Sequence, residues 1–376
     1  MTRREKRFFR RKQKRIQKKM IVLSECGTLE KTASLKSLYY AAKKAAKGVS
    51  WKYAVQIYMA NIFFNIIKAK KNILEEKEIK DKPFVFKICD RGKLRIITSI
   101  PFTQRVQQAA LSRTTLVPVI CKSLVTDNYA CQKNKGTHFA IKRITKKLVR
   151  FSKKYGNNGY ALSIDFKSYF DSIQHEKVRA MLEKYFNDSR VIDLTIRFIK
   201  ASVSGDTGLG LGSEVSQTIA VAFINSIDHY AVEIFKNPYG RYNDDTVILS
   251  NNKEELKIIL NKLKELYSAL NLKLNDKKTH ITKLKDGFKF LKVRFSITNS
   301  GKILKKPCRQ CITKARRRLK KHKKLLDKGV LDMNTIEQSF NSWKGSMRHK
   351  HARKTIYKMD MLYNELFKGG KNHDNK

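Results

Sequence analysis

Three aspartates stand out in a chain dominated by basic residues. Asp244 and Asp245 are adjacent within Gly240-Arg-Tyr-Asn-Asp-Asp-Thr-Val-Ile-Leu-Ser250, where polar residues separate two short flanks and the second flank is β-like. This pattern predicts a hairpin whose turn lets neighbouring carboxylates converge. Asp165 follows the apolar run Tyr160-Ala-Leu-Ser-Ile164, which predicts a strand that carries Asp165 at its end. The three carboxylates are therefore candidate ligands of divalent cations.

Each aspartate alone has an ordinary interpretation, because Asn-Asp-Asp is a common solvated turn and an acid after a strand often caps the next element. The combination indicates phosphoryl transfer to a 3′-hydroxyl. That reaction uses two metal ions about 3.5–4 Å apart, of which one lowers the pKa of the hydroxyl and the other stabilises the leaving pyrophosphate. Carboxylate oxygens are the hard donors that Mg²⁺ prefers. We therefore predict two Mg²⁺ ions at these aspartates, with Mn²⁺ as an alternative.

The charge of the chain points to a polyanionic partner. Its 376 residues are 41% hydrophobic, which is enough for a folded core, and 82 lysines and arginines against 32 acids give a net charge of +50. The basic residues are densest from Thr2 to Lys19 and from Lys314 to Lys324. Nucleic acid supplies the counter-charge such a surface needs, with a membrane surface or a merely solvated face as the alternatives.

Other classes of protein are disfavoured. The longest apolar stretch, Ala54 to Ile67, is interrupted by polar residues and is too short to span a bilayer. The N-terminus lacks the apolar block of a secretory signal, so we expect a cytoplasmic protein without a membrane partner. Six cysteines are scattered, and the pair Cys308-x-x-Cys311 has no recognisable second half of a zinc site. Free thiols are expected, and the role of that pair stays open.

Hydrophobic periodicity and turn residues predict a mixture of helices and short antiparallel strands, that is, an α+β fold. The expected helices cover residues 35–79, 104–116, 139–151, 176–186, 191–201, 216–235 and 254–270, and basic helices run from about Ile303 to the end. The expected strands form hairpins over 84–100 and 240–250, with single strands at 160–165 and 289–297, and a glycine-rich loop covers 205–212.

The acidic motifs resemble those of reverse transcriptases. Tyr242-Asn-Asp-Asp245 is similar to their Tyr-x-Asp-Asp box, and Asp165-Phe-Lys-Ser-Tyr-Phe-Asp-Ser-Ile173 is similar to the acidic box of the bacterial members. The resemblance extends in collinear order from about Phe84 to Phe295. The further blocks are Lys93-Leu-Arg-Ile-Ile, Arg105-Val-Gln-Gln, Asn128-Tyr-Ala, Lys135-Gly-Thr-His, Leu274-Asn-Asp-Lys-Lys and Gly287-Phe-Lys-Phe-Leu.

The resemblance implies an RNA-directed DNA polymerase with a right-hand architecture. Its expected parts are a basic N-terminal extension at 1–35, fingers at 36–135, a palm of antiparallel sheet and helices at 136–299, and a basic helical thumb at 300–376. In the palm, Asp165 and Asp244 would bridge the two metal ions, Asp245 would assist them, and the carbonyl of Phe166 would add a ligand.

The same resemblance implies a nucleotide site. Phe170 would act as the steric gate that excludes a ribose 2′-hydroxyl, with a core aromatic as the alternative interpretation. Arg95, with Lys93 nearby, would clamp the triphosphate through the planar fork of its guanidinium. Lys278 would lie near the pyrophosphate, and its neighbour Lys277 is an open alternative for that role.

The loop Leu211-Gly-Ser-Glu-Val-Ser-Gln217 separates subclasses of this family. Leu211, Gly212, Ser216 and Gln217 match the pattern of enzymes from diversity-generating retroelements, whereas group II intron and retron enzymes usually begin this loop with Gln-Gly. Gly212 would let the backbone approach the nucleotide closely. Leu211 replaces an amide that could hydrogen-bond near the base pair, which favours error-prone copying. Asn243 departs from the Met or Ala that is common before the aspartate pair.

The subclass implies partners and leaves alternatives. Template RNA, a primer or cDNA, dNTPs, a small basic accessory protein and a structured RNA are expected, in a bacterial or phage-encoded system. A defence-associated or group II intron-like reverse transcriptase is the first alternative. The second is a catalytically inactive RNA-binding protein that keeps the palm as a scaffold.

Overall fold

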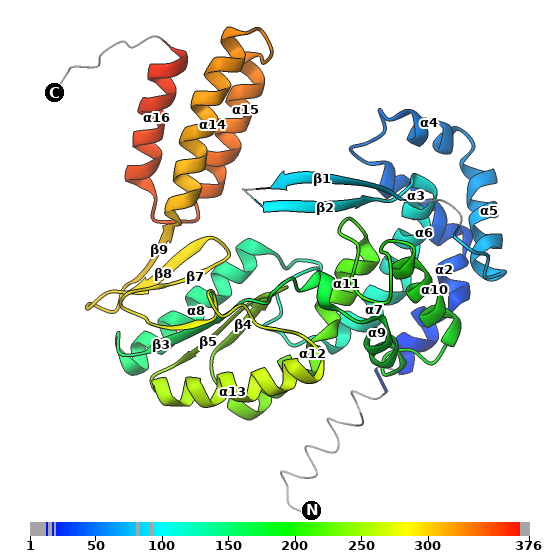
Figure 1. The fold of residues 1–376 in the computed structure, drawn as a ribbon, viewed down its shortest axis with the longest axis horizontal. Coiled ribbons are helices and arrows are strands. Elements are labelled where there is room, and N and C mark those ends of the chain that lie inside the picture. The colour runs from blue at the N-terminus through cyan, green and yellow to red at the C-terminus, as the bar shows by residue number, and fades with distance from the viewer. Residues whose placement is uncertain (1–12, 14–16, 19, 80–82, 91–92, 369–376) are drawn as a thin grey trace, which may run out of the picture. The chain divides into compact units, whose positions relative to one another are not determined.

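The computed structural model describes residues 13, 17–18, 20–79, 83–90 and 93–368 (Figure 1). The basic segment from Thr2 to Lys19 thus falls almost entirely outside the described residues. The chain forms two compact units that alternate along the sequence. The first unit comprises Met1–Lys135, Phe166–Lys236 and Asn261–Asn275, and the second comprises Gly136–Asp165, Asn237–Leu260 and Asp276–Lys376.

The first unit is mostly helical. Its helices are α2 (Leu29–Ala33), α3 (Leu35–Ala46), α4 (Tyr53–Ala60), α5 (Ile62–Leu74), α6 (Phe102–Ala110), α7 (Val117–Ser123), α9 (His175–Glu183), α10 (Ser189–Lys200), α11 (Glu214–Phe223) and α12 (Asn225–Tyr230), with π-helical turns at Leu111–Leu116 and Ala231–Phe235. Short polar side chains begin several of them. Ser34 accepts a hydrogen bond from the N–H of Ser37 at α3, and Ser213 accepts one from Ser216 at α11.

The first unit also carries the predicted basic hairpin. Strand β1 (Phe84–Asp90) pairs antiparallel with β2 (Lys93–Ser99), in a register that runs from Phe84 opposite Ser99 to Asp90 opposite Lys93. The turn residues between them lie outside the described part of the chain. The two strands confirm the predicted hairpin.

The second unit is built on antiparallel sheets. Strands β3 (Tyr160–Ile164), β4 (Tyr239–Tyr242), β5 (Asp245–Ser250) and β6 (His280–Lys283) form a sheet in the order β4-β5-β3-β6. Strands β7 (Phe288–Phe290), β8 (Val293–Ile297) and β9 (Ile303–Pro307) form a second sheet. Helix α8 (Thr137–Tyr155) contacts the first sheet, since the Lys147 ammonium donates to the carbonyl of Tyr239. Helix α13 (Lys253–Ala269) runs from the second unit into the first. The predicted α+β class is confirmed.

Three predicted elements need correction. The strand expected at 289–297 is a hairpin, because Leu291 and Lys292 adopt φ of 50° and 62° and reverse the chain between β7 and β8. Neither residue type signals such a turn, which usually holds Gly, Asn or Asp. The residues from Ile303 to Pro307 form strand β9 rather than the start of a helix, because they pair with β8. Strand β6 was not expected at all.

Three C-terminal helices form a bundle in the second unit (Figure 1). Helices α14 (Arg309–Asp327), α15 (Met333–Met347) and α16 (Arg353–Phe367) share a core in which Phe340 stacks on Tyr363 at 4.6 Å between ring centroids. Of the side chains on α14, only Ala315 and Leu319 are fully buried. The lysines and arginines of α14 therefore lie mostly at the surface. They include the dense basic region from Lys314 to Lys324.

Within the described part of the chain, no helix is both long and apolar enough to cross a bilayer. All six cysteines carry free thiols. Burial raises the pKa of the Cys308 thiol, and the neighbouring Cys311 raises it further, despite nearby basic side chains.

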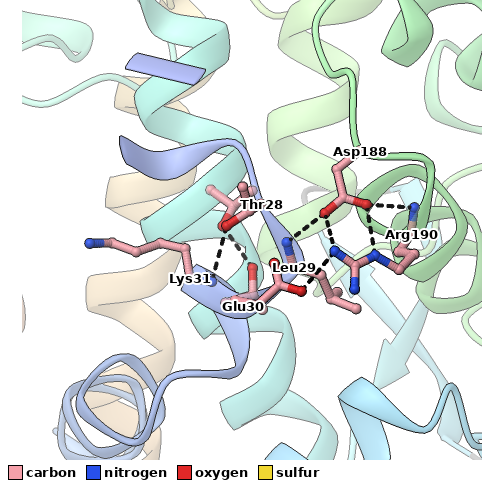
Figure 2. A network of polar contacts seen from close by, with 8 residues as sticks. Thr28, Leu29, Glu30, Lys31, Asp188 and Arg190 are labelled. Carbon is pink, nitrogen blue, oxygen red and sulfur yellow. Dashed lines mark hydrogen bonds and ion pairs between the residues drawn. The ribbon is translucent and has the colours of Figure 1, made fainter. Parts of the chain in front are cut away.

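Asp188 joins the start of the described chain to the rest of the first unit (Figure 2). Its carboxylate accepts hydrogen bonds from the N–H of Leu29 at 3.0 Å and from the N–H of Arg190 at 3.1 Å, and so caps α10. The Arg190 guanidinium bonds both carboxylate oxygens and also Glu30. Burial alone would raise the pKa of Asp188, but the hydrogen bonds from Arg190 and Leu29 outweigh it and lower that pKa.

We expect Asp188→Asn to lower the free energy of unfolding at pH 7 by about 1–2 kcal/mol, because the amide cannot replace the charge-assisted bonds. A carboxyl whose pKa is lowered by folding stabilises the fold above its unfolded pKa and loses that effect as pH falls through the folded value. The deficit should therefore shrink below about pH 4, as chemical denaturation can measure. Asp193→Asn on the same helix removes a more exposed ion pair with Arg179 and should cost less than about 0.5 kcal/mol. Equal losses for both variants would contradict this account.

Candidate active site

Neighbouring strands bring the predicted aspartates together. Tyr242 is opposite Asp245 in the β4–β5 pairing, so Asn243 and Asp244 form a two-residue turn. Asn243 has a φ of 53°, a left-handed conformation that asparagine tolerates better than most residues. Ile164 is opposite Thr246 in the β3–β5 pairing, which puts Asp165 across from Asp245 at the same end of the sheet. Residues opposite each other on antiparallel strands have Cβ atoms roughly 5 Å apart.

A buried arginine stabilises this turn through a hydrogen bond to its backbone. Arg241 on β4 is 0% exposed, and its guanidinium Nη1 donates to the carbonyl of Asn243 at 3.0 Å. Sequence reasoning missed this residue. Its signal was a charged side chain in a strand otherwise made of aromatic and small residues, three positions before Asp244.

Asp245 is an acid with a strongly raised pKa. Its half-buried carboxylate accepts a hydrogen bond from the backbone N–H of Leu291 at 3.1 Å. Burial raises the pKa of Asp245 to about 7, and the negative charges of Asp244 and Asp165 add to the effect. The Leu291 bond and the Lys278 ammonium oppose it only in part. Burial is thus the main cause of the rise, and the two neighbouring aspartates contribute to it.

Asp165 is held by Lys278 and Thr279, the two residues directly before strand β6. Its carboxylate Oδ1 lies 2.7 Å from the Lys278 ammonium, and its side chain is 26% exposed. The Thr279 hydroxyl donates to the carbonyl of Asp165 at 3.2 Å and accepts from its N–H at 3.4 Å. Lys278, predicted to lie near the pyrophosphate, is therefore an ion-pair partner of a predicted metal ligand.

The chemistry of this donor set suits hard cations. Lys278 offsets the negative charge around Asp245 only in part, and a cation would relieve the repulsion that contributes to the raised pKa of Asp245. Among the described residues, however, no group of three or more His, Cys, Asp or Glu side chains is arranged to hold a metal ion by itself. Ligands for a metal would have to include waters or substrate oxygens, as is usual for Mg²⁺.

The first unit holds Phe166 and Phe170. The Phe166 ring is buried against Tyr267 and Tyr169, with ring centroids at 4.8 and 5.0 Å. Phe170 is half-buried, and its carbonyl accepts a hydrogen bond from the N–H of Leu209 at 2.9 Å. The glycine-rich loop therefore fixes the backbone of the predicted steric gate. Whether the Phe166 carbonyl binds a metal and Phe170 excludes a 2′-hydroxyl stays a prediction.

The loop that begins at Leu211 is fastened to β2, the strand that carries Lys93 and Arg95. The N–H of Thr98 donates to the carbonyl of Leu211 at 3.1 Å. Gly212 has a φ of 127°, and a Cβ there would lie 2.6 Å from the carbonyl oxygen of Thr98. Glycine is thus required for the approach to β2. The side chains of Lys93 and Arg95 lie outside the described part of the structure, so their contact with a triphosphate stays a prediction.

Gly212 also lines a cavity of about 310 Å³ in the first unit. Lys44, Arg105 and Arg113 line it, and Arg113 forms an ion pair with Glu214. Sequence reasoning had not assigned these three basic residues to a site. Ser216 is buried on α11, whereas Gln217 is exposed. The roles of Ser216 and Gln217 at a nucleotide stay predictions.

The sheet thus carries Asp165, Asp244 and Asp245 close together at one end. The family model described as reverse transcriptase (RNA-dependent DNA polymerase) matches residues 77–295, more than half of the chain. The chain belongs to this family. The matched range contains all three aspartates as well as Lys278.

One solved structure similar to this chain is apo telomerase from Candida tropicalis, truncated from its C-terminal domain, with a TM-score of 0.45 and 14% sequence identity. The match covers 65% of this chain and 60% of the telomerase chain. A search of curated protein sequences gives no match. The family assignment therefore rests on the family model.

Proposed function

We propose that this chain is an RNA-directed DNA polymerase that adds dNTPs to a primer 3′ end, with Asp165, Asp244 and Asp245 as its metal ligands. The observation that carries the proposal is the convergence of these carboxylates on adjacent strands of one sheet. Burial of Asp245, together with the negative charges of Asp244 and Asp165, raises its pKa to about 7. When bound there, two Mg²⁺ ions, or Mn²⁺, would activate the 3′-hydroxyl and stabilise the leaving pyrophosphate.

The residues of the chain have distinct tasks in this proposal. Asp165 and Asp244 bind the ions, and the Leu291 N–H keeps Asp245 in place beside them. Lys278, 2.7 Å from Asp165, neutralises that carboxylate in the absence of metal. An ammonium freed from Asp165 on metal binding is suited to the negative charge that develops on pyrophosphate.

Template and primer would bind through phosphates and 2′-hydroxyls. Helix α14 has nine lysines and arginines against the single acid Asp327, and its basic side chains are largely exposed. Such a helix binds phosphates without reading sequence. It supports the assignment of the C-terminal bundle as a thumb.

Replacing Asp244 with asparagine should abolish polymerisation. Asp244→Asn keeps the side chain's size but removes a charged ligand, so incorporation of dNTPs on an RNA template should fall by at least about 100-fold. Primer extension with Mg²⁺ measures it. Asp286→Asn, an exposed acid in the same unit, is the matched control and should leave extension unchanged.

Wild-type protein that incorporates no dNTP, even with its cognate RNA and protein partner, would contradict the proposal. It would favour the inactive RNA-binding protein instead. Loss of activity in both aspartate variants would show a general charge effect rather than metal binding.

We further propose that the enzyme copies a template RNA with low fidelity within a diversity-generating retroelement. The support is Leu211-Gly-Ser-Glu-Val-Ser-Gln217, whose first residue lacks the amide found in related polymerases. The backbone carbonyl of Leu211 accepts a hydrogen bond from Thr98. In this proposal the Leu211 side chain contributes the contacts near the base pair. A small basic accessory protein, a structured RNA and a cytoplasmic location accompany this proposal, and a defence-associated or group II intron-like enzyme is its alternative.

Restoring the amide should raise fidelity. Leu211→Gln adds a hydrogen-bonding group, so the misincorporation rate on an RNA template should fall by about 3- to 10-fold. Sequencing of extension products measures the rate, and Leu211→Met is the control of similar size without an amide. An error rate unaffected by Leu211→Gln, or already low in the wild type, would contradict the error-prone role while leaving polymerase activity intact.

A further inference from the structure

A second cavity in the first unit lies apart from every residue predicted for catalysis or nucleotide binding. It has a volume of about 470 Å³ and is formed by α4, α5, the segment after α5, α6 and α10. None of its lining residues belongs to the aspartate site, to β2 or to the loop that starts at Leu211. Its volume is in the range of sites that bind small molecules, roughly 300–1,000 Å³.

The lining is rich in carboxamides. Asn65, Asn72 and Gln107 all contribute side chains that carry both hydrogen-bond donors and an acceptor. The Asn65 amide nitrogen donates to the carbonyl of Tyr58 at 3.1 Å, which fixes its orientation and leaves its oxygen as an acceptor. Carboxamides are the side chains that pair with nucleobase edges, because base edges present donors beside acceptors.

Tyr58 and Ile73 add an apolar wall. Tyr58 is 5% exposed and its ring packs edge-to-face on Phe102, with centroids 5.0 Å apart. Its hydroxyl has no hydrogen-bond partner among the described residues, and burial raises its pKa to about 12, so it stays protonated. A buried hydroxyl left unpaired costs about 1–3 kcal/mol. Ile73, 1% exposed, lies on the same wall.

The surroundings favour an anionic partner with flat rings. The segment from Leu35 to Leu74 contains eight lysines and no acid. Lys68 lines the cavity, as do Lys77 and the acid Glu78. The two helices α4 and α5, which contribute lining residues, also carry exposed aromatic side chains, with Tyr53 at 76% and Phe64 at 69%. Lysines interleaved with exposed aromatics are the surface chemistry of single-strand binding, where bases stack and phosphates meet ammonium groups.

We propose that this cavity binds a nucleotide, with the base between Tyr58 and the carboxamides and the phosphate at Lys68, as part of a second binding site for single-stranded RNA. The flanking strand lies over the exposed aromatics of α4 and α5. The inference goes beyond polymerisation, since it assigns RNA binding to residues that the polymerase site does not use.

The test is fluorescence anisotropy with the full chain and a labelled 12-nucleotide single-stranded RNA, without primer or dNTP. Asn72→Ala and Lys68→Ala should each weaken binding by about 5- to 10-fold. Lys70→Ala is the matched control, because Lys70 is exposed on the same helix but does not line the cavity, and it should change binding less than about 2-fold. All variants should keep wild-type extension of a preformed primer–template, so the two proposals fail separately.

Tyr58→Phe separates binding from structure. Removal of an unpaired buried hydroxyl should leave the melting temperature unchanged or higher, yet RNA binding should weaken. If AMP displaces the labelled RNA, the free nucleotide is also a ligand of the cavity. If AMP does not displace it, the site binds RNA strands only. Equal weakening by Lys68→Ala and Lys70→Ala, or no effect of Asn72→Ala and Tyr58→Phe, would overturn the proposal. Dimers that dissociate on Phe64→Ala would also overturn it, by assigning the aromatic surface to a second copy.

Discussion

Repulsion among three carboxylates is the constraint on which the catalytic end of this protein depends. The pairing of β3 with β5 puts Asp165 opposite Asp245, and a two-residue turn adds Asp244 beside them. The net charge of the chain is +50, so most acids have basic neighbours available. At Asp245, by contrast, burial and the negative charges of the other two aspartates raise the pKa to about 7. In the proposed function, a cation bound between them would relieve this repulsion.

The surrounding backbone holds the acids against that repulsion. Arg241 is fully buried and bonds the carbonyl of Asn243, which fixes the turn from within. Leu291 and Lys292 adopt left-handed conformations that cost about 1 kcal/mol or more each for such residues. In return, the Leu291 N–H donates to Asp245. Backbone strain in the β7–β8 turn thus coincides with positioning of an acid, as is common at functional sites.

Local patterns predicted the parts of the site that lie close in sequence. The hairpin around Asp244 and the strand before Asp165 follow from β-like runs and turn residues, and antiparallel pairing then brings them together. The turn at Leu291 carried no signal, because its conformation is imposed by the pairing of β7 with β8 rather than by residue preference. Likewise, the need for Gly212 comes from a carbonyl of β2 far away in sequence, which no local pattern reveals.

Metal binding at the aspartates is the central claim, and electron paramagnetic resonance of Mn²⁺ tests it most directly. Titration of the wild type, Asp165→Asn and Asp286→Asn with Mn²⁺, in the presence of primer–template and an unreactive dNTP analogue, compares their affinities. The account predicts that Asp165→Asn loses at least about tenfold in Mn²⁺ affinity while Asp286→Asn matches the wild type. Equal Mn²⁺ affinity in all three proteins would contradict it.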